Sequence, residues 1–402
     1  MNIFKYIKRN GLQHSIKIIY KYKLKEIQQK ITDKVTCKQP LQKSIVIESH
    51  NDFDENGGAF YNYLIKHGYN KDYKIVWLLK HQIPNNLPEN VIAFPLYGPS
   101  WKKALNISRA KYILTDQDCI GSNRKDQVSI YLTHGGFGLK KWRGKMHLPY
   151  NLSYALMSSK ALAPIERYND GIENYPVKSL ILGFPEHDIF YEKTDDELLK
   201  VTKHQYSKVI LWMPTFRKSI DGRNDGTFRE NIGVPVITDL NEFNKLNSYL
   251  KQKDVLLIIK IHPMQDISTL KIKSLSNIKV LTGEDVKKLN INNYKLMKDT
   301  DALISDYSSA AYDYMHLNRP IGFTMDDVKT YKLGLIVDDP KKFIGGPIIN
   351  NFDDMKDFIY DVLNGKDTYK TKRNNIFNIV FEYHDGNSCE RLARFLKLER
   401  DK

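Results

Sequence analysis

The chain has 402 residues, of which 41% are hydrophobic and 27% are charged, and its formal net charge is +15. This composition excludes an intrinsically disordered chain, and the length favours two or three domains over one. The positive charge favours an anionic partner, which could be a nucleic acid, an acidic membrane or a phosphate-bearing substrate. Three cysteines lie far apart with no Cys-x-x-Cys motif, so neither a zinc site nor a disulfide framework is expected.

The first 31 residues combine apolar and basic side chains. They lack the roughly 18 consecutive apolar residues that a spanning helix needs, and lysines break the apolar run that a signal peptide needs. Apolar side chains recur at nearly helical spacing, at Phe4, Ile7, Leu12, Ile16, Ile19, Leu24 and Ile27. A basic amphipathic helix over residues 1–34 is therefore expected, which either binds an anionic bilayer surface or packs on the protein with a solvated basic face.

Strand and helix patterns then alternate along the chain. In the first half, strands are expected at residues 43–50, 73–80, 90–95, 111–116 and 127–132, with helices at 57–69 and 100–110. After a charged segment near residues 186–206 the alternation restarts, with strands at 208–216, 254–263, 277–283 and 301–306 and helices at 240–252, 292–300 and 309–318. Such alternation is typical of βαβ units and parallel sheets.

These patterns predict an α/β fold with four parts. They are the amphipathic segment at 1–34, a Rossmann-like domain at 35–195, a second Rossmann-like domain at 196–375, and a C-terminal helix within 376–402 that packs back on the first domain. Two such domains would face each other across a cleft at the carboxyl ends of their strands, where ligands of doubly wound folds bind.

Two histidines follow predicted strands at the edge of this cleft. His134 comes just after an apolar strand, and Gly135 and Gly136 allow the backbone to turn tightly beside a ligand. His262 precedes Pro263, which ends another apolar strand. An imidazole accepts a proton near neutral pH, which makes His134 a candidate base. The alternative for either histidine is a structural role in its turn.

Two further clusters are suited to phosphate. Thr215 and Arg217 follow a strand, and a guanidinium can form paired hydrogen bonds with a phosphate; a surface arginine is the alternative. In the segment SDYSSAAYDY, Ser308 and Ser309 would begin a helix, where unpaired N–H groups and the helix dipole attract an anion. The alternative there is an ordinary helix cap by Asp306 or Ser308.

Five segments in this order resemble the CDP-glycerol glycerophosphotransferase family, which includes the bacterial teichoic acid primases and polymerases. They are THGGFGLKK, PTFRKS, KIHP, ISDYSSAAYDYMHLNRPIGF and HDGNSCERL, and the resemblance covers residues 40–396. It implies a GT-B-like fold, in which the C-terminal Rossmann-like domain holds most of the nucleotide donor. It also implies attachment to the cytoplasmic face of the cell membrane.

The resemblance implies roles for individual residues. His134 and His262 would be catalytic, the first as general base and the second beside the donor phosphates. The implied donor-binding residues are Thr215, Arg217, Asp306, Tyr307, Ser308, Ser309, Asp313, Ser388 and Arg391, and the implied acceptor-side residues are Gly135, Gly136 and Lys140. The family motif WHGTPLK is THGGFGLK here, with Thr133 replacing tryptophan and Gly136 replacing threonine, so the acceptor side is altered.

The implied reaction moves an alditol phosphate, with glycerol phosphate as the first choice, from a CDP-activated donor to a hydroxyl. The acceptor would be a lipid-linked saccharide or a growing teichoic acid or capsule-like polymer, and CMP would leave. The expected partners are this donor, this acceptor and an anionic membrane surface, with no cofactor, no metal and no nucleic acid. The alternatives are a GT-B glycosyltransferase that uses a nucleotide sugar and a non-catalytic membrane-surface scaffold.

Overall fold

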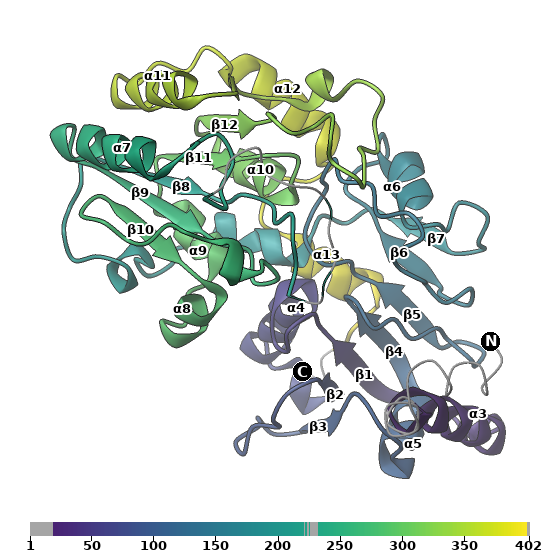
Figure 1. Ribbon diagram of the computed structural model, residues 1–402. Helices are drawn as coiled ribbons and strands as arrows, with labels where there is room; N and C mark the ends of the chain where they lie inside the picture. The colour runs from purple at the N-terminus through teal and green to yellow at the C-terminus, as the bar shows by residue number, and fades with distance from the viewer. Residues whose placement is uncertain (1–18, 221, 223–224, 226–231, 400–402) are drawn as a thin grey trace, which may run out of the picture.

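The computed structural model describes residues 19–220, 222, 225 and 232–399 (Figure 1). Two parallel β-sheets follow one another along the chain, and helices cover them. The predicted α/β class with parallel sheets is confirmed. Figure 1 shows the first sheet in purple to blue and the second in teal to green.

The first sheet has seven strands in the order β3-β2-β1-β4-β5-β6-β7. They are β1 (Gln42–Glu48), β2 (Lys74–Leu79), β3 (Val91–Pro95), β4 (Ala110–Thr115), β5 (Val128–Tyr131), β6 (Tyr154–Leu156) and β7 (Lys178–Leu180). Its helices are α4 (Glu55–Lys66), α5 (Trp101–Arg109) and α6 (Ala163–Asn169). Ile45, Val46 and Ile47 are fully buried, as continuous apolar strands are when helices cover both faces of a parallel sheet.

The second sheet has six strands in the order β10-β9-β8-β11-β12-β13. They are β8 (Lys208–Trp212), β9 (Val255–Lys260), β10 (Ile278–Leu281), β11 (Ala302–Ser305), β12 (Ile321–Thr324) and β13 (Ile348–Ile349). Its helices are α7 (Leu240–Gln252), α8 (Gly283–Lys288), α9 (Asn293–Lys298), α10 (Ser309–Asp313), α11 (Phe352–Leu363) and α12 (Lys370–Val380). In both sheets the strand order reverses between the first and fourth strands of the unit, which is where doubly wound folds bind ligands.

Strands end earlier than predicted at two prolines. In the second sheet β8 ends at Trp212 and β9 ends at Lys260, although the patterns predicted that these strands continue to Phe216 and Pro263. Pro214 and Pro263 have no N–H to donate to a neighbouring strand, so the chain leaves the sheet before each of them. The polar residues that follow therefore lie in loops at the carboxyl edge of the sheet.

Most of the predicted amphipathic helix falls on residues 1–18, which lie outside the described residues. From Ile19–Lys23 (η1) the chain is helical and continues into α3 (Leu24–Thr36), which packs against α5. The polar residues Gln28, Thr32 and Thr36 form its buried face. Its apolar residues face outward, which is the reverse of an ordinary surface helix. Among the described residues, no helix is long and apolar enough to cross a membrane.

The C-terminal helix α13 (Ser388–Phe395) returns to the first sheet unit. It packs against α4 and against η3 (Pro185–Phe190), and Figure 1 shows it in yellow beside α4. The backbone N–H groups of Ser388 and Cys389 donate to the carboxylate of Asp188, each at 2.8 Å. Helix α13 and the first described α-helix, α3, therefore both pack on the first sheet unit.

Candidate active site

A cavity of about 1010 Å³ lies at the carboxyl ends of both sheets. The segments that follow β1, β4 and β5 line it from the first sheet, and those that follow β8 and β9 line it from the second. His134 and Lys140 reach it from one side and His262 reaches it from the other. The structure thus brings both predicted catalytic histidines and one predicted acceptor-side residue to the same cavity.

The turn after His134 is held by α4. The backbone N–H of Gly135 donates to Glu55 Oε2 at 3.1 Å, and Gly135 has a φ of +70°, a conformation that favours glycine. A side chain at Gly136 would overlap Asp313 Oδ1, so this tight contact explains the glycine where the family motif has threonine. His134 is thereby presented on a turn with little freedom to move.

His262 has a defined tautomer when it is neutral. The backbone N–H of Met264 donates to His262 Nδ1 at 3.1 Å, so Nδ1 carries the lone pair and Nε2 carries the hydrogen. The ring of Phe216 packs against the imidazole with its centroid 4.7 Å away. His262 is therefore suited to donate a hydrogen bond to a ligand oxygen, rather than to accept a proton.

Three predicted donor-binding residues form a buried support. Asp306 accepts hydrogen bonds from the N–H and hydroxyl of Thr215, at 2.9 and 2.7 Å. Arg217 is 2% exposed and donates from Nε and Nη2 to the two carboxylate oxygens of Asp327. Burial alone would lower the pKa of Arg217, but its hydrogen bonds to Asp327 raise that pKa above the usual value. These side chains fix the loop after β8 and do not line the cavity.

Ser308 and Ser309 begin α10, as predicted. Ser308 has extended backbone angles, its side chain makes no capping hydrogen bond, and both serines are half-buried. The glycine turn of the first sheet unit lies directly against them, because a Cβ at Gly138 would stand 2.9 Å from Ser309 N and one at Gly135 would stand 3.1 Å from Ser309 Oγ. Neither serine lines the 1010 Å³ cavity in this arrangement.

The other predicted donor-binding residues lie away from the cavity. Tyr307 is fully buried and donates to Asp327, and Asp313 is buried with Oδ1 3.0 Å from His187 Nε2. Ser388 contacts Asp188, and Arg391 donates to Leu182 O at 2.9 Å. The structure therefore brings His134, His262 and Lys140 together, but it does not bring these four residues to the same surface.

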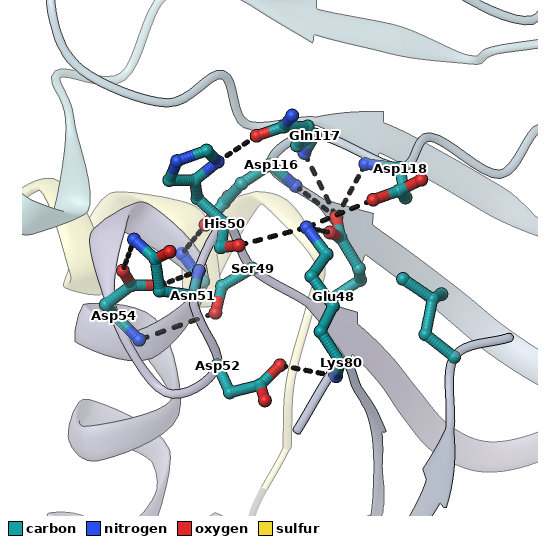
Figure 2. A network of polar contacts seen from close by, with 12 residues as sticks. Glu48, Ser49, His50, Asn51, Asp52, Asp54, Lys80, Asp116, Gln117 and Asp118 are labelled. Carbon is teal, nitrogen blue, oxygen red and sulfur yellow. Dashed lines mark hydrogen bonds and ion pairs between the residues drawn. The ribbon is translucent and has the colours of Figure 1, made fainter. Parts of the chain in front are cut away.

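A buried polar network that no motif indicated supports the cavity from the first sheet (Figure 2). Glu48 ends β1, and its Oε2 accepts from the backbone N–H groups of Asp116, Gln117 and Asp118 at 3.0 to 3.1 Å. Lys80 Nζ lies 2.9 Å from Glu48 Oε1 and 3.0 Å from Asp118 Oδ2. The sequence indicates this network only through Glu48, which ends the apolar run SIVIE. A carboxylate at the end of a buried strand needs hydrogen-bond or ion-pair partners.

Comparison with known proteins identifies the family. A model of the CDP-Glycerol:Poly(glycerophosphate) glycerophosphotransferase family matches residues 32–398. The teichoic acid ribitol-phosphate primase of Bacillus spizizenii is 27% identical over 300 residues, which cover 68% of this chain and 70% of that protein. The teichoic acid glycerol-phosphate primase of Bacillus subtilis is 26% identical over 315 residues, which cover 72% and 74%.

Longer relatives match over part of their length. The teichoic acid ribitol-phosphate polymerase TarL of Staphylococcus aureus is 27% identical over 260 residues, which cover 62% of this chain and 42% of that protein. The structure of the wall teichoic acid polymerase TagF shares the fold, with a TM-score of 0.71 at 18% identity over 98% of this chain and 97% of that one. The chain therefore belongs to the CDP-glycerol:poly(glycerophosphate) glycerophosphotransferase family, as its motifs predicted, and is a CDP-alditol phosphotransferase.

Proposed function

We propose that this chain transfers glycerol phosphate from CDP-glycerol, or the corresponding ribitol phosphate, to a hydroxyl of a lipid-linked saccharide or of a growing teichoic acid or capsule-like polymer. The observation that carries the proposal is the one cavity that His134 and His262 line from opposite sheets. A GT-B-like arrangement of two Rossmann-like domains, with the donor on the second, accounts for a catalytic pair of this kind.

The reaction needs a base, charge stabilisation and precise placement. The acceptor hydroxyl attacks the phosphorus next to the alditol, an oxygen–phosphorus bond forms, and the bond from that phosphorus to CMP breaks. His134 takes the hydroxyl proton, and His262 donates from Nε2 to a phosphoryl oxygen. Phosphoryl transfer requires little covalent participation by the protein, so the positioning of donor and acceptor supplies most of the acceleration.

The donor phosphates would bind at the start of α10. Ser308 and Ser309 offer hydroxyl groups there, and Asp306, Thr215 and Arg217 hold the loop beneath them. Because the glycine turn lies against Ser309, the donor enters beside it or displaces it. Lys140 would contact the acceptor, since it lines the same cavity as His134.

A purified-enzyme assay tests this proposal. CMP release is measured with CDP-glycerol, CDP-ribitol and a UDP-sugar, each with a lipid-linked saccharide acceptor. The proposal predicts CMP release from a CDP-alditol that depends on the acceptor and is lost in His134→Ala. Consumption of the UDP-sugar alone would favour the nucleotide-sugar glycosyltransferase. Full function of His134→Ala in cells would favour the non-catalytic scaffold.

Peripheral attachment to an anionic membrane surface, at its cytoplasmic face, is the second part of the proposal. One side of η1 and α3 exposes a row of apolar side chains, namely Tyr20, Leu24, Ile27, Ile31 and Val35, which are 41 to 72% exposed. The residues one position earlier form a row beside the apolar one, with three lysines (Lys23, Lys30 and Lys34) and Glu26, which pairs with Lys23 at 2.9 Å. An apolar row flanked by lysines suits the boundary of acyl chains and anionic headgroups.

Vesicle sedimentation tests the attachment. The variant with Ile27→Glu and Ile31→Glu should stay in the supernatant with vesicles of anionic lipid, whereas the wild type sediments. Its activity on a soluble acceptor should persist, because both side chains are exposed. Leu199→Glu is a matched control, since Leu199 is 52% exposed elsewhere on the surface. Unchanged sedimentation of the double variant would show that this face does not bind the bilayer.

A further inference from the structure

Three neighbouring strands bring three side chains to one point of the cavity. β1, β4 and β5 lie side by side in the first sheet, and His50, Gln117 and His134 follow their carboxyl ends. All three residues line the cavity. This is the reversal point of the strand order, where a doubly wound fold gathers its functional side chains.

The two imidazoles are stacked. The ring centroids of His50 and His134 are 5.1 Å apart, and their planes differ by 10°. His50 Nδ1 is hydrogen-bonded to Gln117 Oε1. An amide oxygen is an acceptor, so in the neutral ring Nδ1 carries the hydrogen and the plane of His50 is fixed.

The polar network beneath His50 fixes it further (Figure 2). Gln117 donates its backbone N–H to Glu48 Oε2 at 3.0 Å, and Lys80 Nζ donates to the backbone carbonyl of His50 at 3.0 Å. Figure 2 shows Gln117 and His50 directed toward each other above Glu48 and Lys80. The plane of the His50 ring is therefore fixed, whereas most side chains at the edge of a cavity can rotate.

His134 lacks the usual partner of a catalytic base. Its Nδ1 is buried and has no hydrogen-bond partner within the described part of the chain. A base of this type is commonly oriented by a third group that binds its second nitrogen. Among the described residues, the stacked ring of His50 is the aromatic contact of His134.

We infer that His50 is a positioning residue for His134, and that it acts by ring stacking instead of by a hydrogen bond. The inference rests on the proposed role of His134 as the base. Gln117 and the Glu48 network hold His50, and His50 holds His134 so that Nε2 faces the acceptor hydroxyl. A small rotation of a base in such a site is costly, because transfer depends on near-attack geometry.

His50 is poorly suited to act as the base itself. Burial, together with the neighbouring His134 and Lys80, lowers the pKa of His50 to about 4, although Glu55 and Asp118 act in the opposite direction. His50 is therefore uncharged near neutral pH. Because His50 is uncharged, it does not repel the positive charge that His134 acquires when His134 takes up a proton.

Two substitutions separate stacking from other roles. His50→Ala removes the stacked imidazole ring. It should lower kcat about 10- to 100-fold, while the KM for the CDP-alditol stays within about twofold of the wild-type value. His50→Phe keeps a flat ring and should retain at least about half of the wild-type kcat, with the same pH profile. The inference fails if His50→Ala is as fast as the wild type, or if His50→Phe is as slow as His50→Ala.

A measurement without substrate tests the stack directly. Selective histidine labelling and NMR should show the His134 ring protons shifted by the neighbouring ring in the wild type and in His50→Phe, but not in His50→Ala. The same spectra should show His50 uncharged, with hydrogen on Nδ1, down to about pH 5. If the His134 ring protons show no such shift in the wild type, the inference is wrong, whatever the donor proves to be. If the shift is present but the enzyme is inactive on CDP-alditols, only the proposed function is wrong.

Discussion

Asp306 is a motif residue whose side chain bonds only to other parts of the protein among the contacts of the described residues. Its carboxylate is fully buried and accepts from both donors of Thr215 and from the backbone N–H of Ser308 at 3.0 Å. Arg217 Nη2 lies 3.7 Å from Asp306 Oδ2. One side chain thus joins the loop after β8 to the start of α10, where the donor phosphates are proposed to bind.

Replacing Asp306 should cost stability. Asp306→Ala leaves a buried arginine with one carboxylate fewer and the donors of Thr215 unsatisfied, so the free energy of unfolding should fall by about 3 kcal/mol. Urea denaturation measures it. Asp353→Ala is the control, because Asp353 is exposed and its ion pair with Lys356 should contribute less than about 1 kcal/mol. Equal losses in the two variants would contradict the buried-support role.

Helix α6 supports the cavity from behind, although no motif marked it. Asp170 follows α6 and accepts from Trp142 Nε1 at 3.1 Å, while Asn169 accepts from the Trp142 N–H at 2.9 Å. Trp142 lines the cavity. Glu166 lies inside α6, and both of its carboxylate oxygens accept from the backbone N–H of Ser158. Helix α6 and the residue that follows it therefore carry two carboxyl groups whose pKa values are raised by burial.

The stability of the protein should depend on pH through Glu166. Burial raises the pKa of Glu166 to about 8, although hydrogen bonds from Ser158 oppose the shift. The unfolded value is about 4.3, so the folded state holds an extra proton between these values. This stabilisation is complete below the unfolded value and is lost as pH rises through about 8.

Comparison with an amide isolates that contribution. Glu166→Gln keeps an oxygen that accepts from Ser158 but cannot ionise, so its urea midpoint should fall less than that of the wild type between about pH 5 and pH 8. Asp170, whose pKa burial raises to about 7, is present in both proteins and cancels in the difference. Identical pH slopes for the two proteins would show that Glu166 stays charged when folded.

The two sheet units meet at the glycine turn. The N–H of Leu139 donates to Tyr307 O at 3.0 Å, and Asp313 of α10 pairs with His187 of η3. Gly136 lies against this pair, with Asp313 Oδ1 and His187 Cε1 in the space that a side chain would fill. The two units therefore approach each other here at a distance that only glycine permits.

Adding one methyl group there should separate the units. Gly136→Ala should lower the free energy of unfolding by about 1–3 kcal/mol, because a packed interior resists extra volume, and should lower kcat as well. Gly283→Ala is a control, since its nearest neighbour would be Pro263 Cα at 3.3 Å. Thermal unfolding and turnover of both variants provide the measurement. Gly136→Ala with wild-type stability and turnover would mean that the contact can relax freely.

Long apolar strands and the residues at their ends were predictable from the sequence. β9 and β11, with His262 and Asp306 after them, lie where their patterns placed them to within a few residues. β6, β7 and β13 have only two or three residues, too few for any periodicity, and form because a sheet edge is already present. The positioning role inferred for His50 was not predicted from the sequence. It depends on β1, β4 and β5 being neighbours in the sheet, which the order of residues alone does not specify.

The burial of the donor motif was also beyond reach of the sequence. The alternatives were a surface arginine for Arg217 and a helix cap for Asp306, but both side chains are buried. Arg217 is paired with Asp327, which lies 110 residues further along the chain. A paired buried charge and a free surface charge look alike until the partner is known.

Donor affinity and single-turnover rate of His134→Ala test most directly whether His134 is the base of this cavity. We expect the CDP-alditol to bind within a few-fold of the wild-type dissociation constant, while the rate of CMP release falls by about 10²- to 10⁴-fold. A variant that turns over at the wild-type rate, or one that loses donor binding in place of turnover, would show that another group removes the acceptor proton.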